Sequence, residues 1–131
     1  VWKKRYQQIN NFEKQLAEEG TTILKFFLHI SLDEQKERFM ERLDVPEKNW
    51  KFNAGDLEER KLWSEYMKAF EEAIAKTSTE WAPWYVVPAN RNWFRNMVVS
   101  SVKAETMKSL KMEYPKPDID VDLMKKLLAD S

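Results

Sequence analysis

The chain has 131 residues, of which 43% are hydrophobic and 13% aromatic, and this is enough apolar material for the core of about one domain. Its 22 basic and 22 acidic side chains cancel, which removes the usual electrostatic argument for a general nucleic-acid or membrane-surface binder. The absence of cysteine and the single histidine exclude disulfide scaffolds, cysteine nucleophiles, thiolate metal sites and multi-histidine metal sites.

Glycine is scarce, since only Gly20 and Gly55 are present, and the chain therefore cannot contain a glycine-rich phosphate-binding loop. No apolar run approaches the ~20 residues of a membrane span and no signal peptide is visible, so we expect a cytoplasmic location without a membrane partner. The chain opens on Val1 within a helical pattern, which indicates a piece of a larger protein.

The first third of the chain predicts a helix, a strand and a second helix. Apolar residues at helical spacing precede Gly20, which is suited to end the helix; they are Trp2, Tyr6, Ile9, Phe12 and Leu16. Residues 21–30 are β-branched and aromatic with little alternation, which is typical of a strand inside a covered, parallel sheet. Ser31 and Glu34 have the spacing of a capping box that opens the second helix, and Pro46 ends it.

The middle of the chain predicts a loop, a long helix and a short strand. Residues 44–55 contain proline, asparagine and glycine and indicate a loop. Asp56 and Glu59 form a second candidate capping box, followed by an apolar stripe that predicts one long helix to about Lys76. Residues 85–87 predict a strand bracketed by prolines.

A further helix is expected from about Asn90, and a short amphipathic helix in the tail near residues 123–128. The order of elements predicts a mostly helical α/β fold with two parallel strands. Two strands do not make a stable sheet by themselves, so we expect part of the fold to lie outside this chain.

Two groups of cations are candidate anion ligands. Arg38 and Arg42 lie four residues apart on a helix, where like charges repel slightly; they belong either to a solvated face or to a pair that grips phosphate oxygens. Lys48 and Lys51 flank Trp50 in the following loop, and they either close over a polyanion or decorate an ordinary surface loop pinned by Trp50.

Two polar residues follow the predicted strands, at the edge of the sheet where ligands bind in such folds. His29 is either a structural group or a catalyst, and Asn90 is either a helix cap or a ligand contact. The alternating acids Asp118, Asp120 and Asp122 lack the other positions of a calcium loop, which favours capping and solvation.

Ordered blocks with compatible gaps run from about residue 6 to 110. They are Tyr6-x-x-Ile9-Asn10-x-Phe12, Lys25-Phe26-Phe27-Leu28-His29-Ile30-Ser31, Glu34-Gln35-x-x-Arg38-Phe39-x-x-Arg42, Pro46-x-Lys48-x-Trp50-Lys51-Phe52, Trp63-x-x-Tyr66-x-x-Ala69 and Thr77-Ser78-Thr79-x-x-Ala82-Pro83-Trp84-Tyr85-Val86-Val87-Pro88-Ala89. In their order and spacing these blocks resemble the polyphosphate kinase 2 family.

The resemblance implies the C-terminal part of a three-layer P-loop kinase fold similar to thymidylate kinases. Residues 1–114 would form this half-domain with its lid at about 32–56, and residues 115–131 a tail helix. The implied activity is transfer of a phosphoryl group between inorganic polyphosphate and AMP, ADP or GDP. It implies Mg²⁺ as cofactor, held by carboxylates in the missing N-terminal half together with the P-loop, so the isolated chain is expected to be inactive.

The resemblance also implies roles for single residues. The arginines of the lid would be catalytic and bind phosphate, and the lysines after them would bind polyphosphate: Arg38, Arg42, Lys48 and Lys51. Ala89 and Asn90 would lie beside the nucleotide, whereas Asn92 stands where relatives commonly have lysine. Implied partners are polyphosphate, an adenine or guanine nucleotide, the missing half and further copies in a dimer or tetramer, with no nucleic acid. Two alternatives stay open: a nucleoside monophosphate kinase-like P-loop kinase with ATP as donor, and a non-catalytic helical interaction module.

Overall fold

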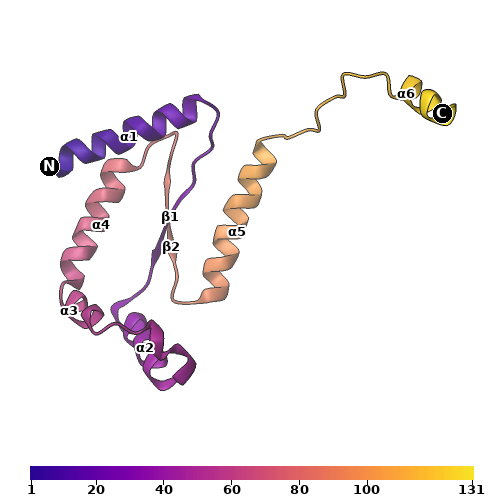
Figure 1. Cartoon of the computed structure of the whole chain (residues 1–131). Helices are drawn as coiled ribbons and strands as arrows, with labels where there is room; N and C mark the ends of the chain where they lie inside the picture. Colours follow the sequence, from indigo (N-terminus) through magenta and orange to yellow (C-terminus); the bar gives the residue numbers. More distant parts are fainter. The chain divides into compact units, whose positions relative to one another are not determined.

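The computed structural model describes all residues, 1–131, and the chain divides into two compact units, residues 1–101 and 102–131. The elements in chain order (Figure 1) are α1 (Trp2–Glu18), β1 (Lys25–His29), α2 (Leu32–Asp44), the 3₁₀ helix η1 (Pro46–Lys51), α3 (Gly55–Lys61), α4 (Trp63–Thr77), β2 (Trp84–Pro88), α5 (Asn92–Ser109) and α6 (Val121–Ala129). The predicted first helix is confirmed, and Gly20 follows it with a positive φ of 87°.

The two strands pair in parallel, as predicted, and form a two-stranded sheet. The register runs from Lys25 opposite Trp84 to His29 opposite Pro88. β1 is shorter than the expected 21–30, because its partner β2 is only five residues long and pairing ends with it.

Helices lie on both sides of the strand pair in the first unit. Figure 1 shows α1 and α4 on one side and the beginning of α5 on the other. The rings of Phe27 and Phe70 are 4.9 Å apart between centroids, which places α4 against the β1 face that carries Phe27. The Asn10 side chain donates to the carbonyl of Lys76 at 2.9 Å and joins α1 to the end of α4.

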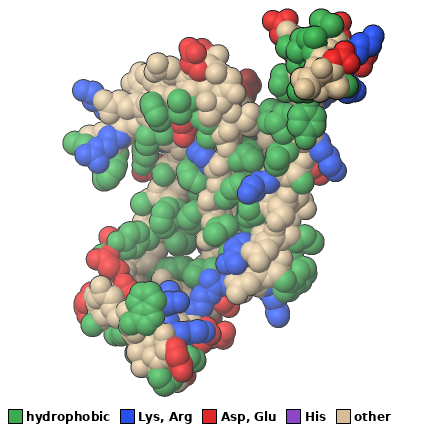
Figure 2. Space-filling view, turned by 45° about the vertical axis from the view of Figure 1, so that its right-hand side comes forward, with side chains coloured by type: hydrophobic (Ala, Val, Ile, Leu, Met, Phe, Trp, Pro, Cys, Tyr) green, Lys and Arg blue, Asp and Glu red, His purple; other side chains and the backbone are tan.

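Little of this chain is fully buried. The buried apolar residues are Ala82, Val87 and Ala89. Leu28 and Val86, in the middle of the sheet, are 46% and 56% exposed, and Figure 2 shows broad hydrophobic areas on the surface. A two-stranded sheet with exposed apolar faces agrees with the expectation that further structure is needed to cover it.

The start of α2 is capped as predicted, whereas the predicted start at Asp56 is wrong. The Ser31 hydroxyl accepts from the backbone N–H of Glu34 at 3.1 Å. Asp56 lies inside the first turn of α3, because the side chain of Asn53 already accepts from the N–H of Gly55 at 2.9 Å and turns the chain earlier.

The long helix expected from residue 56 to Lys76 is two helices, α3 and α4, interrupted at Leu62. The interruption lets α3 pack against α2, where Arg60 Nη1 donates to the Leu32 carbonyl and to Gln35 Oε1, each at 2.8 Å. The apolar pattern along residues 56–76 could not predict this contact, because the partner of Arg60 is Leu32, 28 positions away.

The expected loop at 44–55 contains η1, which Pro46 starts with its fixed backbone angle. In the second unit, the predicted tail helix is confirmed as α6. Asp120 Oδ1 caps it by accepting from the N–H groups of Asp122 and Leu123 at 3.1 and 3.0 Å. None of the helices combines the length and apolar character that crossing a bilayer demands.

A largely covered lysine joins α1, α4 and the sheet. Lys25 Nζ donates to Glu13 Oε2 at 2.7 Å and to the Thr77 carbonyl at 2.6 Å, and it lies 5.2 Å from the ring centre of Trp84. The Lys25 and Glu13 side chains are only 11% and 13% exposed. Lys25 also compensates the negative end of α4, since Thr77 is its last residue.

Lys25→Met is expected to lower the free energy of unfolding by about 2 kcal/mol, because it leaves the partly buried carboxylate of Glu13 unpaired. Urea unfolding followed by tryptophan fluorescence measures the change. Adding Glu13→Gln to Lys25→Met removes the unpaired carboxylate charge and should recover part of the lost free energy of unfolding. Lys14→Met, in an exposed pair with Glu18, is the matched control and should stay within about 0.5 kcal/mol. Equal effects at both lysines would contradict the role assigned to Lys25.

A second bond spans the break between α3 and α4. The Tyr66 hydroxyl donates to the Glu59 carboxylate, and this hydrogen bond raises the pKa of Tyr66 above its ordinary 10.0. The stability from this bond is therefore complete below about pH 10 and is lost as the pH rises through the raised pKa of Tyr66.

Glu59→Gln should lower the pKa of Tyr66, because the bond to a charged acceptor is lost. Ultraviolet titration of tyrosinate, as the difference from Tyr66→Phe, isolates this residue among the four tyrosines. Glu58→Gln, which removes only the partner of Lys61, is the control and should leave the titration unchanged.

Candidate functional site

Arg38 is held firmly in the middle of α2. Its Nε donates to Glu34 Oε1 at 2.8 Å, one turn earlier on the helix. Its Nη2 donates to the Ala89 carbonyl at 2.8 Å and reaches the Asn90 carbonyl at 3.5 Å. Its Nη1 has no protein partner, and the side chain is 31% exposed. Arg38 therefore belongs neither to a freely solvated face nor to a fully satisfied structural network.

Arg42 is held more loosely, one turn further along α2. Its nearest carboxylate is Asp56 at 4.0 Å, and its guanidinium lies 5.4 Å from the ring centre of Phe39. Both partners of the ion pair are more than a third exposed, so their attraction is weak and screened by solvent. An incoming anion can replace Asp56 at low cost.

The two lysines are on η1, directly after α2. Lys48 donates to Glu41, and this hydrogen bond and charge lower the pKa of the Glu41 carboxyl. Lys51 has no carboxylate within 4.0 Å, and its Nζ lies 5.2 Å from the ring centre of Trp50. Of the four cations, only Lys51 therefore has no ion pair within the chain.

The expectation that Trp50 pins this segment is wrong, since its side chain is 79% exposed. Asn49 holds the segment instead. Its Nδ2 donates to the carbonyls of Arg42 and Leu43 at 2.7 and 2.9 Å and reaches that of Val45 at 3.3 Å. The carbonyls of Arg42 and Leu43 are at the end of α2, where the helix leaves them without an internal partner, so the Asn49 side chain supplies the missing donor and fixes the turn.

Ala89 and Asn90 follow β2 and meet α2. Ala89 is 1% exposed, its N–H donates to the His29 carbonyl at 2.7 Å, and its carbonyl receives Arg38. Asn90 Oδ1 accepts from the Ser31 N–H at 2.9 Å, and Asn90 Nδ2 donates to the Ser31 hydroxyl at 3.2 Å. The alternative that Asn90 caps its own helix is therefore wrong, because its side chain is engaged by the start of α2.

A hollow of about 350 Å³ adjoins this turn at the carboxyl edge of the sheet. Its lining combines polar and aromatic side chains: His29, Ser31, Pro88, Asn90, Arg91, Trp93 and Phe94. Trp93 is 66% exposed, which leaves an indole face open beside the hollow. The single histidine is thus at the predicted ligand edge of the sheet.

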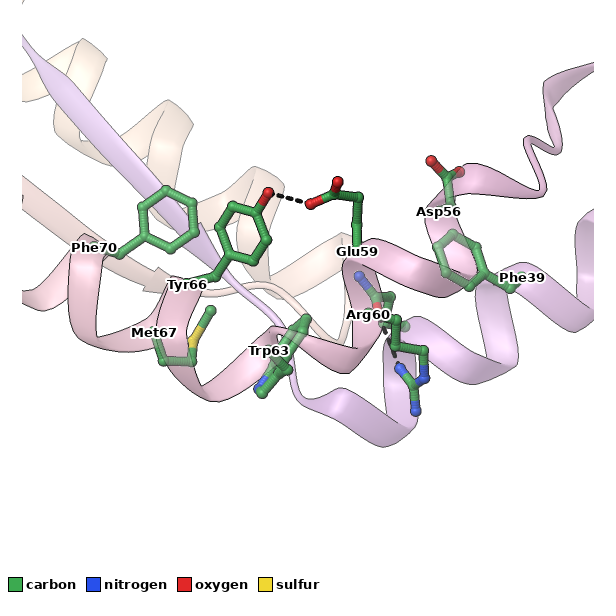
Figure 3. A pocket seen from close by; sticks show the side chains of 9 residues that line it. Phe39, Asp56, Glu59, Arg60, Trp63, Tyr66, Met67 and Phe70 are labelled. Atoms are coloured by element: carbon green, nitrogen blue, oxygen red, sulfur yellow. Dashed lines mark hydrogen bonds between the residues drawn. The ribbon is translucent and has the colours of Figure 1, made fainter.

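A second pocket, of about 320 Å³, lies where α2, α3 and α4 meet (Figure 3). Phe39 and Phe70 lie at its two ends in the figure, and Tyr66 and Glu59 face each other across their hydrogen bond. Asp56, beside Arg42, and Arg60, which ties α3 to α2, also line it. The sequence did not single out Arg60, because it lies in no motif and its partners are on another helix.

The candidate site is therefore built from two segments in direct contact. Arg38 touches the turn at Ala89 and Asn90, and η1 is fixed against the end of α2 through Asn49. Figure 2 shows basic and acidic side chains intermingled where α2 lies. No group of three or more His, Cys, Asp or Glu side chains gathers to hold a metal ion.

Comparison with known proteins identifies the family to which the chain is similar. Residues 1–115 match the family described as polyphosphate kinase 2. The chain is 63% identical over 118 residues to an AMP/ADP-polyphosphate phosphotransferase of Meiothermus ruber, covering 90% of this chain and 44% of that protein. It is 56% identical over 114 residues to an ADP-polyphosphate phosphotransferase of Rhodopseudomonas palustris, covering 87% and 39%. The chain thus spans less than half the length of these two relatives.

A solved structure gives the same result for the fold. The crystal structure of polyphosphate kinase 2 from Arthrobacter aurescens TC1 superposes with a TM-score of 0.93 at 48% identity, covering 98% of this chain and 46% of that one. The expected fold class is therefore confirmed. With a family match over residues 1–115 and this structural likeness, the chain belongs to the polyphosphate kinase 2 family.

Proposed function

We propose that this chain is part of a polyphosphate:nucleotide phosphotransferase, to which it contributes the lid and the nucleotide-side turn. The observation that carries the proposal is the family match over residues 1–115, since this span includes α2, η1 and the turn after β2. Relatives named as AMP/ADP- and ADP-polyphosphate phosphotransferases support the substrate class.

The donor polyphosphate would lie along the cations of α2 and η1. Phosphoryl transfer depends mainly on positioning and on neutralising charge, and guanidinium groups match phosphate oxygens in two-point contacts. Arg38 offers its unpaired Nη1, while Arg42 would exchange Asp56 for phosphate. Lys48 and Lys51 would extend the contact from η1, and residues 32–56 would act as the lid.

The acceptor nucleotide would lie beside the turn at Ala89 and Asn90. The hollow of about 350 Å³ at the same sheet edge supports this assignment, because Trp93 and Arg91 add an aromatic face and a cation there. AMP, ADP and GDP are all compatible with such a surface. The nucleotide phosphates would then meet the end of the polyphosphate beneath the lid.

The remaining parts of the active site would come from outside residues 1–131. We assign the phosphate-binding loop and the magnesium-binding carboxylates to that part of the protein, and we expect residues 1–131 alone to show no turnover. A dimer or tetramer and a cytoplasmic location stay predictions.

Arg42→Ala and Lys51→Ala should each weaken polyphosphate binding by roughly three- to tenfold, because each removes a charged donor. Titration of the whole protein that contains residues 1–131 with long-chain polyphosphate, followed by tryptophan fluorescence, measures this. Lys36→Ala is the matched control: Lys36 lies about 200° around α2 from Arg38 and should leave affinity unchanged. Arg42→Lys should recover only part of the affinity, since lysine cannot bind two oxygens in one plane. Equal losses for all these variants would contradict a local site.

The same titration distinguishes the proposal from a nucleotide kinase with ATP as donor. Long-chain polyphosphate should bind several-fold more tightly than tripolyphosphate, because it can contact α2 and η1 together. ATP should displace it poorly. Displacement by ATP at concentrations near those of polyphosphate would favour the nucleotide kinase instead.

A further inference from the structure

Five residues join the start of α2 to the turn after β2, and we name this group the α2 clasp: Ser31, Glu34, Arg38, Ala89 and Asn90. Asn90 and Ser31 exchange two hydrogen bonds, at 2.9 and 3.2 Å. Arg38 Nη2 adds a bond to the Ala89 carbonyl at 2.8 Å. The partners are 51 and 59 residues apart in the chain, so the clasp fixes two distant segments on each other.

Asn90 completes a capping box that Glu34 leaves unfinished. In such a box the third helical residue bonds back to the N–H of the cap. Here the Glu34 carboxylate turns instead to Arg38 Nε at 2.8 Å, and the free Ser31 N–H is taken by Asn90 Oδ1. Glu34 is thereby released to orient the arginine.

Arg38 is oriented from two sides as a result. Glu34 holds Nε and the Ala89 carbonyl holds Nη2, so the plane of the guanidinium is set while Nη1 has no protein partner. An arginine fixed in advance loses less rotamer freedom when it binds an anion, and it presents its remaining donors in one direction.

We propose that Asn90 is a positioning residue for Arg38: by binding Ser31 it holds α2 on the turn after β2 and aims Nη1 of Arg38 at the substrate phosphates. This inference rests on the proposed function. In this role the side chain of Asn90 contacts the protein and not the nucleotide, since both polar atoms of its carboxamide are already bonded to Ser31. Nucleotide contact at this turn is then made by the neighbouring surface.

A double-mutant cycle tests the proposal in the whole protein that contains residues 1–131, with long-chain polyphosphate as the ligand. Asn90→Ala should weaken polyphosphate affinity about two- to tenfold, although Asn90 touches no phosphate, and Arg38→Ala should weaken it by at least as much. Asn90→Ala should have no further effect when Arg38 is already alanine, because its influence passes through that side chain. Asn11→Ala, an exposed helical asparagine on α1, is the matched control and should bind as the unaltered chain does.

Hydrogen exchange gives a readout that does not depend on polyphosphate. The Ser31 amide should exchange several-fold faster in Asn90→Ala, because its acceptor is gone. Ser31→Ala tests the clasp from the other side and should weaken polyphosphate binding similarly. Ser31→Thr keeps the hydroxyl and should restore affinity, and this pair carries the test if Asn90→Ala does not fold.

The outcomes separate this inference from the proposed function. Normal affinity in Asn90→Ala and Ser31→Ala, with a clear loss in Arg38→Ala, would overturn the positioning role and leave polyphosphate binding intact. Additive losses from Asn90 and Arg38 would also overturn it, since they would indicate a direct ligand contact by Asn90. Absence of any polyphosphate binding by the unaltered whole protein would overturn both proposals.

Discussion

The parallel pairing of β1 and β2 is the constraint on which the candidate site depends. Because the strands run in the same direction and in register from Lys25 to His29, their carboxyl ends come out at one edge. The bond from the Ala89 N–H to the His29 carbonyl carries the pairing one step beyond the sheet. This geometry brings Ser31 and Asn90 together, although they are 59 residues apart and no local sequence pattern links them. An antiparallel pair would have put these ends at opposite edges.

A neutral chain can still offer a polyanion site, since affinity depends on local groups rather than on net charge. Three of the four candidate cations are within 4.0 Å of a carboxylate, and those carboxylates are Glu34, Asp56 and Glu41. The pairs of Arg42 and Lys48 are more than a third exposed and contribute little stability, so exchanging their carboxylates for a phosphate costs little, whereas Glu34 stays on Arg38. The composition argument against general nucleic-acid or membrane-surface binding therefore does not extend to a phosphate chain held by a few oriented groups.

α2 is held at both of its ends. At its beginning, the α2 clasp and the bonds from Arg60 to Leu32 and Gln35 hold it from two sides. At its far end, Asn49 on η1 donates to the carbonyls of Arg42 and Leu43. The guanidinium of Arg38 is oriented by Glu34 and Ala89, whereas Arg42 has only its weak, exposed pair with Asp56. The candidate cations therefore differ in how firmly the protein fixes their direction.

Local patterns in the sequence were sufficient for features that depend on neighbours three or four residues away. They predicted the first helix, the Ser31 cap and the tail helix, because the spacing of apolar and capping residues reflects a helical turn. They also predicted parallel strands, because the first strand is apolar on both faces. The predictions of a cap at Asp56 and of a single long helix were wrong. Asn53 turns the chain before Asp56 by accepting from the Gly55 N–H, and Arg60 binds the Leu32 carbonyl on another helix. Only the tertiary structure decided that Arg38 reaches the Ala89 carbonyl and that Asn90 serves α2, since strand pairing brings together residues more than 50 positions apart.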